Sequence, residues 1–156
     1  FLDVSGREHY RLLAWLSTQF NNTTLLDIGT YKGCSALALA YNKTNNVHSF
    51  DLGNYRQINE TASNISYVLD DFTLDKYKSM VMESPLIMLD VDHDGSFEHI
   101  AYQHLTDINW VGYLLLDDIY LNDAMKQFWD SIDREKYDIT RVGHYTGTGL
   151  VIFNKG

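Results

Sequence analysis

Carboxylates and a histidine gather in two short stretches of this chain. Residues 90–98 read Asp-Val-Asp-His-Asp-Gly-Ser-Phe-Glu, and an acid pair, Asp117 and Asp118, follows further along. Carboxylate oxygens are ligands for hard divalent cations, and a histidine of ordinary pKa can take a proton near neutral pH. These residues could therefore hold a metal ion and place a general base beside it.

Two other interpretations of the acids were weighed. The stretch from Asp90 contains D-x-D-x-D-G, which begins an EF-hand calcium loop, but the twelfth position is Ala101 where a bidentate glutamate is required. The residues before Asp90 also read as a strand and not as a helix. Each aspartate could instead cap a following helix. For Asp90, Asp117 and Asp118 as a set we favour a metal, because converging carboxylates cannot all stay ionised without a cation.

A third stretch could bind a polar ligand. In residues 24–35 an apolar run stops at Gly29, a second glycine stands at Gly33, and a helix-like run follows. This pattern predicts a strand, a tight turn, and a helix whose free N–H groups face the turn. Asp51 ends the next apolar run, at the distance where an acid can hold a ribose diol. The spacing G-x-x-x-G lacks the middle glycine of a dinucleotide fingerprint, and the bulky Tyr31 and Lys32 disfavour a pyrophosphate.

The elements that must position these residues alternate along the chain. Apolar runs predict strands over 24–28, 47–51, 65–69, 85–89 and 113–116, helices over 6–20, 33–42, 54–62, 74–82, 97–105 and 122–132, and a closing antiparallel hairpin over 137–143 and 149–154. We expect an α/β fold with a Rossmann-like, doubly wound, mostly parallel sheet and a C-terminal antiparallel hairpin. The acids that end the strands would then share the edge where such sheets bind ligands.

Composition limits the function classes. With 156 residues the chain fits one domain, and a net charge of −9 argues against nucleic acid as a partner. No apolar run reaches membrane-spanning length, so we expect no membrane partner and a cytoplasmic location. The single Cys34 excludes an internal disulfide and is read as a packing residue. The chain begins at Phe1 without Met, so we expect a single domain over 1–156 cut from a longer protein, with neighbouring domains as further partners.

Together these motifs resemble one family. The chain resembles class I S-adenosylmethionine (SAM) methyltransferases in four features: D-I-G-T-Y-K-G-C-S, the acid Asp51, L-D-V-D-H-D-G-S-F-E and G-Y-L-L-L-D-D. Within this class it most resembles the metal-dependent macrocin-type O-methyltransferases, whose characterised members methylate sugar hydroxyls. The resemblance covers residues 24 to 120. It implies SAM as cofactor, with Asp71 beside the adenine unless Asp70 takes that place. The implied cofactor-binding set is Asp27, Gly29, Thr30, Tyr31, Gly33, Ser35, Asp51 and Asp71.

The same resemblance implies a divalent metal, Mg²⁺ first with Mn²⁺ or Ca²⁺ as alternatives, held by Asp90, Asp117 and Asp118. The candidate base is His93 or Asp92. The predicted function is methyl transfer from SAM to the hydroxyl of a free or glycan-linked sugar. Two alternatives stay open: a catechol-type O-methyltransferase, which typically has Asn where Asp118 stands, and a non-catalytic SAM-fold binding domain. A nucleic-acid amino-methyltransferase is excluded, because the single Pro85 leaves no N/D-P-P-Y motif.

Overall fold

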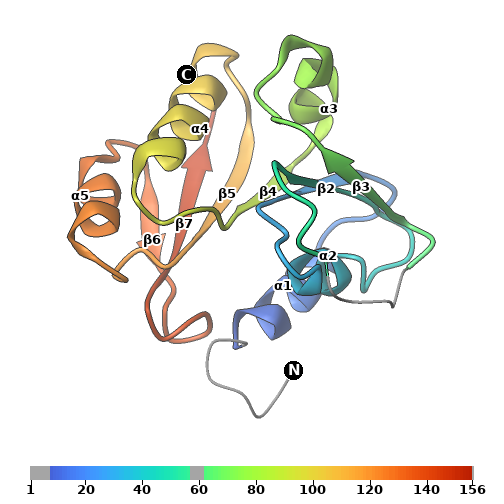
Figure 1. Cartoon of the computed structure of the whole chain (residues 1–156), viewed down its shortest axis with the longest axis horizontal. Helices are drawn as coiled ribbons and strands as arrows, with labels where there is room; N and C mark the ends of the chain where they lie inside the picture. Colours follow the sequence, from blue (N-terminus) through green and yellow to red (C-terminus); the bar gives the residue numbers. More distant parts are fainter. Residues whose placement is uncertain (1–7, 57–61, 156) are drawn as a thin grey trace.

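One mixed sheet forms the centre of the molecule (Figure 1). The computed structural model describes residues 8–56 and 62–155. Within these ranges the strand order is β3-β2-β1-β4-β5-β7-β6; β1 to β5 run parallel, and β7 runs antiparallel to both β5 and β6. The strands are β1 Thr24–Ile28, β2 Asn46–Asp51, β3 Ile65–Leu69, β4 Leu86–Leu89, β5 Gly112–Asp117, β6 Lys136–Asp138 and β7 Thr148–Phe153. This architecture confirms the predicted fold class.

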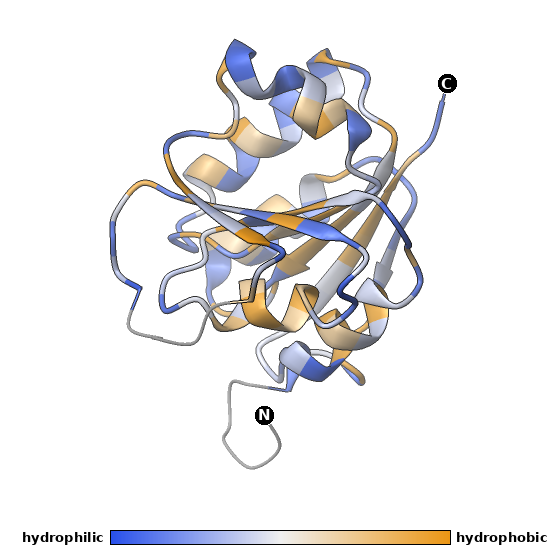
Figure 2. Ribbon diagram, turned by 90° about the vertical axis from the view of Figure 1, so that its right-hand side faces the viewer, coloured by the Kyte–Doolittle hydropathy of each residue, from blue (hydrophilic) through white to orange (hydrophobic). Residues whose placement is uncertain are grey.

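Helices cover both faces of the sheet (Figures 1 and 2). On one face α1 (His9–Ser17) and α2 (Cys34–Leu39) pack on alternate strand residues such as Leu25 and Met88. On the other face α3 (Lys78–Glu83), α4 (Ser96–Asp107) and α5 (Asp123–Ser131) pack on the intervening residues, such as Leu26 and Leu89. Because both faces are covered, the strands are apolar throughout, which is the pattern that predicted them. Among the described residues, no helix has the length and apolar character needed to cross a membrane.

The predicted elements agree with the structure except at particular ends. Strands 24–28 and 65–69 are confirmed to the residue. Of the helix expected over 54–62, residues 57–61 lie outside the described part, and 54–56 are not helical. The start of the first expected helix also lies outside it, and α1 is described from His9. The segment expected as a helix over 74–82 begins with a 3₁₀ turn, η1 (Asp75–Tyr77), before α3.

The first strand of the hairpin is shorter than predicted. It was expected over 137–143, but β6 ends at Asp138. The Asp138 carboxylate accepts a hydrogen bond from the Thr140 N–H at 2.9 Å, and this side-chain turn diverts the backbone from the ladder.

The strand order places two sets of residues at one edge of the sheet. The order reverses between β1 and β4, and ligands bind outside the carboxyl ends of the strands at such a switch point. Because β7 is antiparallel, its first residue, Thr148, pairs with Asp117 at the end of β5. The loop between β6 and β7 therefore reaches the same edge as the acids.

Candidate active site

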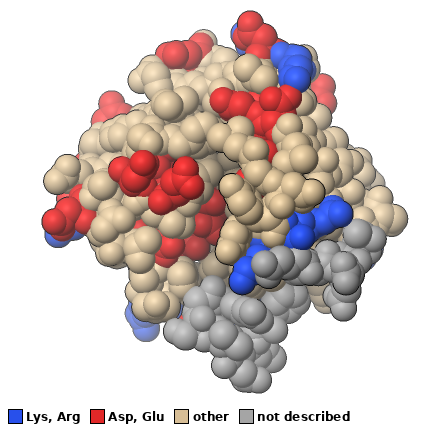
Figure 3. Space-filling view, viewed as in Figure 1, with Lys and Arg blue, Asp and Glu red and all other residues tan. Residues whose placement is uncertain are grey.

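A pocket of about 530 Å³ opens at the carboxyl edge of the sheet. Figure 3 shows more acidic than basic surface on this face of the molecule. The predicted residues that line the pocket are Gly29, Tyr31, Asp51, Asp71, Asp90, Asp92 and His93, together with the alternative Asp70. A second pocket of about 200 Å³ shares Tyr31 and Asp51 with the first and includes Thr30. Four of the predicted cofactor residues and both candidate bases therefore line one cavity.

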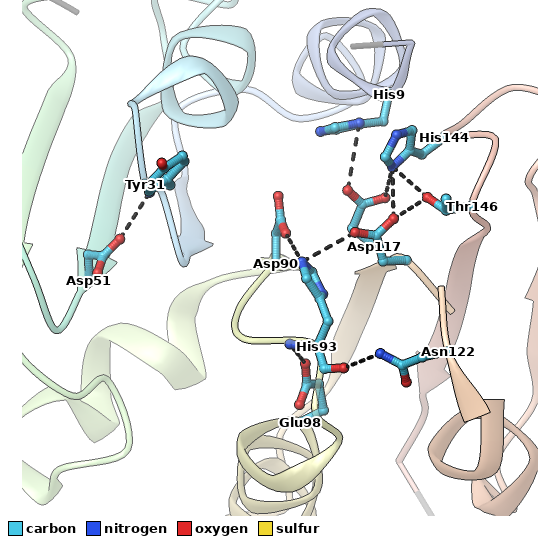
Figure 4. A network of polar contacts seen from close by, with 11 residues as sticks. His9, Tyr31, Asp51, Asp90, His93, Glu98, Asp117, Asn122, His144 and Thr146 are labelled. Carbon is cyan, nitrogen blue, oxygen red and sulfur yellow. Dashed lines mark hydrogen bonds and ion pairs between the residues drawn. The ribbon is translucent and has the colours of Figure 1, made fainter. Parts of the chain in front are cut away.

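The turn after β1 and the acid at the end of β2 form one unit. Gly29 has φ +87°, and a Cβ at this position would overlap the Asp90 carbonyl, so both conformation and space require glycine. The Tyr31 N–H donates a hydrogen bond to Asp51 Oδ2 at 2.9 Å (Figure 4), and Asp51 Oδ1 accepts one from the Gly53 N–H at 3.0 Å. Gly33, with φ +94°, precedes the first residue of α2. The carboxylate of Asp51 is thus held at the pocket by backbone donors.

Three of the predicted cofactor residues are buried in this turn or next to it. Asp27 is fully buried and accepts a hydrogen bond from the Ser49 hydroxyl at 2.8 Å. Burial raises the pKa of Asp27 to about 6, against the lowering effect of the hydroxyls of Ser35, Ser49 and Thr30. Ser35 and Thr30 are also buried. Asp27 and Ser35 support the turn from below and do not line the larger pocket.

The two acids after β3 both line the pocket. Asp71 Oδ1 accepts hydrogen bonds from the Thr73 N–H at 2.8 Å and from its hydroxyl at 2.7 Å. Asp70 Oδ2 accepts a hydrogen bond from the Tyr77 hydroxyl at 2.9 Å. The assignment of Asp71, with Asp70 as the alternative, to the adenine side stays a prediction.

His93 joins the end of β4 to the end of β5. Its Nε2 lies 3.2 Å from Asp90 Oδ1 and 3.2 Å from Asp118 Oδ2. Burial lowers the pKa of His93, but the hydrogen bond to Asp90 and the charges of Asp118 and Asp117 outweigh it, so the pKa is raised. Burial raises the pKa of Asp90. The side chains of Asp90, His93 and Asp118 together offer ligand atoms close enough to hold one metal ion.

Two residues that the sequence did not indicate fix the backbone of His93. His93 has φ +57°, a left-handed conformation that is uncommon for residues other than glycine. Its N–H donates to Glu98 Oε1 at 3.0 Å, and its carbonyl accepts from Asn122 Nδ2 at 2.8 Å (Figure 4). Glu98 is buried, and Asn122 also caps α5 by accepting from the Met125 N–H at 2.9 Å. The imidazole is therefore aimed by contacts from two helices.

Asp117 faces a different group from the one predicted for it. Its Oδ1 lies 3.4 Å from His144 Nδ1, and its Oδ2 lies 3.7 Å from His9 Nδ1 (Figure 4). His144 Nδ1 also lies 3.0 Å from Asp118 Oδ1, which accepts a hydrogen bond from the Thr146 hydroxyl. The contacts with the carboxylates of Asp117 and Asp118 raise the pKa of His144 to about 10. The role of Asp117 as a third ligand beside Asp90 and Asp118 stays a prediction.

The two histidines beside Asp117 were also missed by sequence reasoning. His144 stands in the turn of the predicted hairpin. An antiparallel strand added to the last parallel strand must begin at that strand's carboxyl edge, so the turn before it could have been placed at the acids. His9 had no comparable signal, because its position depends on how α1 packs across the sheet.

No protein-family model matches the chain, and no curated relative does. Several solved structures are similar to this chain in their fold. Cofactor-bound Rv0187 from MTB aligns over 99% of this chain and 83% of its own length, with a TM-score of 0.72 and 16% identity.

Two further matches are methyltransferases. The SAH-bound methyltransferase PaMTH1 from Podospora anserina covers 99% of this chain and 82% of its own, with a TM-score of 0.68 and 16% identity. The O-methyltransferase TomG from Streptomyces achromogenes, in complex with SAM, covers 98% and 82%, with a TM-score of 0.63 and 14% identity. The chain has the fold of SAM-dependent methyltransferases. Its pocket lies at the edge of the sheet where this kind of fold binds ligands.

Proposed function

We propose that this protein transfers a methyl group from SAM to a sugar hydroxyl with the help of a divalent cation. One observation carries the proposal: Asp90, His93 and Asp118 converge beside a cavity that Gly29 and Asp51 also line. The side of the cavity at Gly29 and Asp51 suits a cofactor. The side at Asp90 and His93 suits an acceptor whose hydroxyl must lose a proton. SAM supplies a methyl group on a sulfonium, and its displacement mainly requires approach and alignment.

The cofactor wall fits SAM in its donors and its space. The turn at Gly29 brings bare backbone to the cavity, because no side chain can stand there. The Asp51 carboxylate is preset by backbone donors and can accept hydrogen bonds from ribose hydroxyls. Asp71 or Asp70 would border the adenine. The methyltransferases PaMTH1 and TomG, which share this fold, hold SAH and SAM respectively, and this supports the choice of cofactor.

The acceptor wall fits a hard divalent cation. Asp90 and Asp118 present oxygen ligands around one point, the donor type that Mg²⁺ and Mn²⁺ prefer. A bound cation would orient the acceptor and stabilise negative charge on its oxygen. A cation bound to the two carboxylates would replace His93 as their charge partner, and the neutral imidazole could then take the proton from the hydroxyl. Asp92, which lines the same pocket, is the alternative base.

A turnover assay tests this function. The protein is incubated with SAM and a panel of free and glycan-linked sugars, with catechols as the competing acceptor class, with and without EDTA. We expect methylated sugar and SAH only when divalent metal is present. Asp90→Asn should abolish turnover and leave SAM affinity largely intact, because the cation serves the acceptor.

Asp94→Asn is the matched control. Asp94 lies on the same loop, but its carboxylate is exposed and accepts hydrogen bonds from the Ser96 N–H at 2.8 Å and from the Ser96 hydroxyl. An asparagine keeps an accepting oxygen there, so turnover should persist. If catechols are methylated faster than every sugar tested, the acceptor is aromatic and not a sugar. Full activity after exhaustive chelation would exclude a metal from the reaction. SAM binding without turnover on any acceptor would favour the non-catalytic alternative.

A further inference from the structure

We propose that His9, Asp117 and His144 form a second metal site, which binds a borderline transition-metal ion of the Zn²⁺ type. The three residues come from segments far apart in the chain: α1, the end of β5, and the loop between β6 and β7 (Figure 4). Their ligand atoms all lie within 4.8 Å of one another. A metal here would join α1 and the loop between β6 and β7 to the end of β5.

The first observation is that polar atoms in this group lack hydrogen-bond partners. His9 is 2% exposed, and within the described residues neither of its ring nitrogens makes a hydrogen bond. Asp117 Oδ1 likewise accepts none, and Asp117 is 3% exposed. Buried polar groups without partners are rare because their desolvation is not compensated. The Nδ1 of His9 points at Asp117, so a ligand between them would satisfy both side chains.

The second observation is the spacing of the ligand atoms. His9 Nδ1 stands 3.7 Å from Asp117 Oδ2, which is too long for a hydrogen bond, and His144 Nδ1 stands 3.4 Å from Asp117 Oδ1. Bonds of about 2.0–2.1 Å to a tetrahedral zinc place neighbouring ligand atoms about 3.3–3.5 Å apart. The two spacings are therefore close to those of ligands on one ion to which the Asp117 carboxylate binds through both oxygens, and one ligand atom from each of the three residues lies within 4.8 Å of the others.

The chemistry of the donors separates this site from the one at Asp90. Two imidazoles and one carboxylate suit zinc and its neighbours in the transition series, whereas the carboxylates of Asp90 and Asp118 suit magnesium. Three protein ligands leave one tetrahedral position, which a water molecule can fill, and Asp118 stays with the group at Asp90. The two sites can thus be loaded and measured separately.

This site does not depend on the proposed methyl transfer, because metal binding needs neither SAM nor an acceptor. The experiment titrates the metal-free protein with Co²⁺ in excess Mg²⁺ and follows the visible spectrum, and then adds Zn²⁺ as competitor. We expect the intense absorption of tetrahedral Co²⁺, and its loss when Zn²⁺ displaces the cobalt. Histidine NMR signals assigned to His9 and His144 should shift on Zn²⁺ addition.

The variants make the test specific. His9→Gln and His144→Gln should each weaken Zn²⁺ binding by more than the ~10–100-fold that loss of an outer-shell partner costs. His99→Gln, on the exposed side of α4, is the matched control and should bind as wild type does. Asp90→Asn should keep the cobalt spectrum even where it abolishes turnover, so failure of one proposal is distinguishable from failure of the other.

The proposal is overturned if wild-type protein gives no tetrahedral cobalt spectrum, or if His9→Gln binds Zn²⁺ as tightly as wild type. The histidines would then act only as charge partners that keep Asp117 buried. Should either variant fail to fold, the wild-type spectrum and the two assigned histidine signals still decide the question.

Discussion

Replacing Asp27 by asparagine should stabilise the protein more at neutral pH than at low pH. Asp27 is fully buried at the base of the turn, and burial raises its pKa from 3.8 to about 6. In the unfolded chain this carboxyl ionises at its ordinary pKa. Between these two values the folded state binds more protons than the unfolded state, so the contribution of Asp27 to stability falls as pH rises. An asparagine carries no such dependence.

The magnitude follows from the same shift. A pKa difference between 3.8 and about 6 corresponds to about 3 kcal/mol, since one unit is worth about 1.36 kcal/mol. This is the cost of ionising Asp27 in the folded protein, and it is complete once the pH exceeds about 6. An asparagine side chain is close to isosteric with that of aspartate, and its amide oxygen can still accept from Ser49. At pH 4 the carboxyl of the unfolded chain is already more than half ionised. We therefore expect the free energy of unfolding of Asp27→Asn, minus that of wild type, to rise by about 2 kcal/mol between pH 4 and pH 7.

Urea unfolding of both proteins across this range measures the difference. Low protein concentration is needed, because the range includes the isoelectric point near 4.9. Subtracting the wild-type curve removes titrations that the two proteins share. Ser49→Ala, which deletes the hydroxyl donor at 2.8 Å, should steepen the fall in stability by raising the pKa of Asp27 further. A difference that stays flat, or that decreases as pH rises, would refute the argument from burial.

The remaining predictions concern the pocket. Asp51→Ala should weaken SAM binding by about 1–3 kcal/mol through loss of charge-assisted hydrogen bonds, and unchanged affinity by calorimetry would count against the ribose assignment. His93→Ala should lower kcat by about 10²–10⁴-fold; a larger effect of Asp92→Asn would make Asp92 the base. Asn122→Asp keeps the oxygen that caps α5 but loses the donor to the His93 carbonyl, so kcat should fall on the order of 10²-fold at unchanged SAM affinity. Normal kcat in Asn122→Asp would show that Glu98 alone holds the loop.

Local patterns were sufficient to predict most of the fold. The apolar runs at 24–28 and 65–69 gave the strands because both faces of the sheet are covered, and Gly29 gave the turn because no Cβ fits against the Asp90 carbonyl. The edge shared by Asp90 and Asp118 followed from the parallel order of the strands. The predicted ends were less accurate for elements that a single side-chain hydrogen bond terminates, as the early end of β6 at Asp138 shows.

The partners of the site residues could not be predicted in the same way. Asp117 was expected with Asp90 and Asp118, but its two oxygens face His144 and His9. Adjacent residues at a strand end point in different directions, so neighbours in sequence need not share a ligand. The side chain that meets each of them is set by the packing of α1 and of the loop before β7, which involves contacts across the whole chain.

The reversal of strand order between β1 and β4 assigns the two walls of the pocket to different halves of the chain. Gly29 and Asp51 belong to the first half, while Asp90, Asp92 and His93 belong to the second. Residues 139–147 join β6 to β7 at this edge. They take no part in the hydrogen bond between Tyr31 and Asp51. An exchange of that loop would leave the Gly29 and Asp51 side of the pocket in place, but the new loop would have to keep the contacts of His144 and Thr146 with Asp118. The fold is therefore modular at this edge only up to those two contacts.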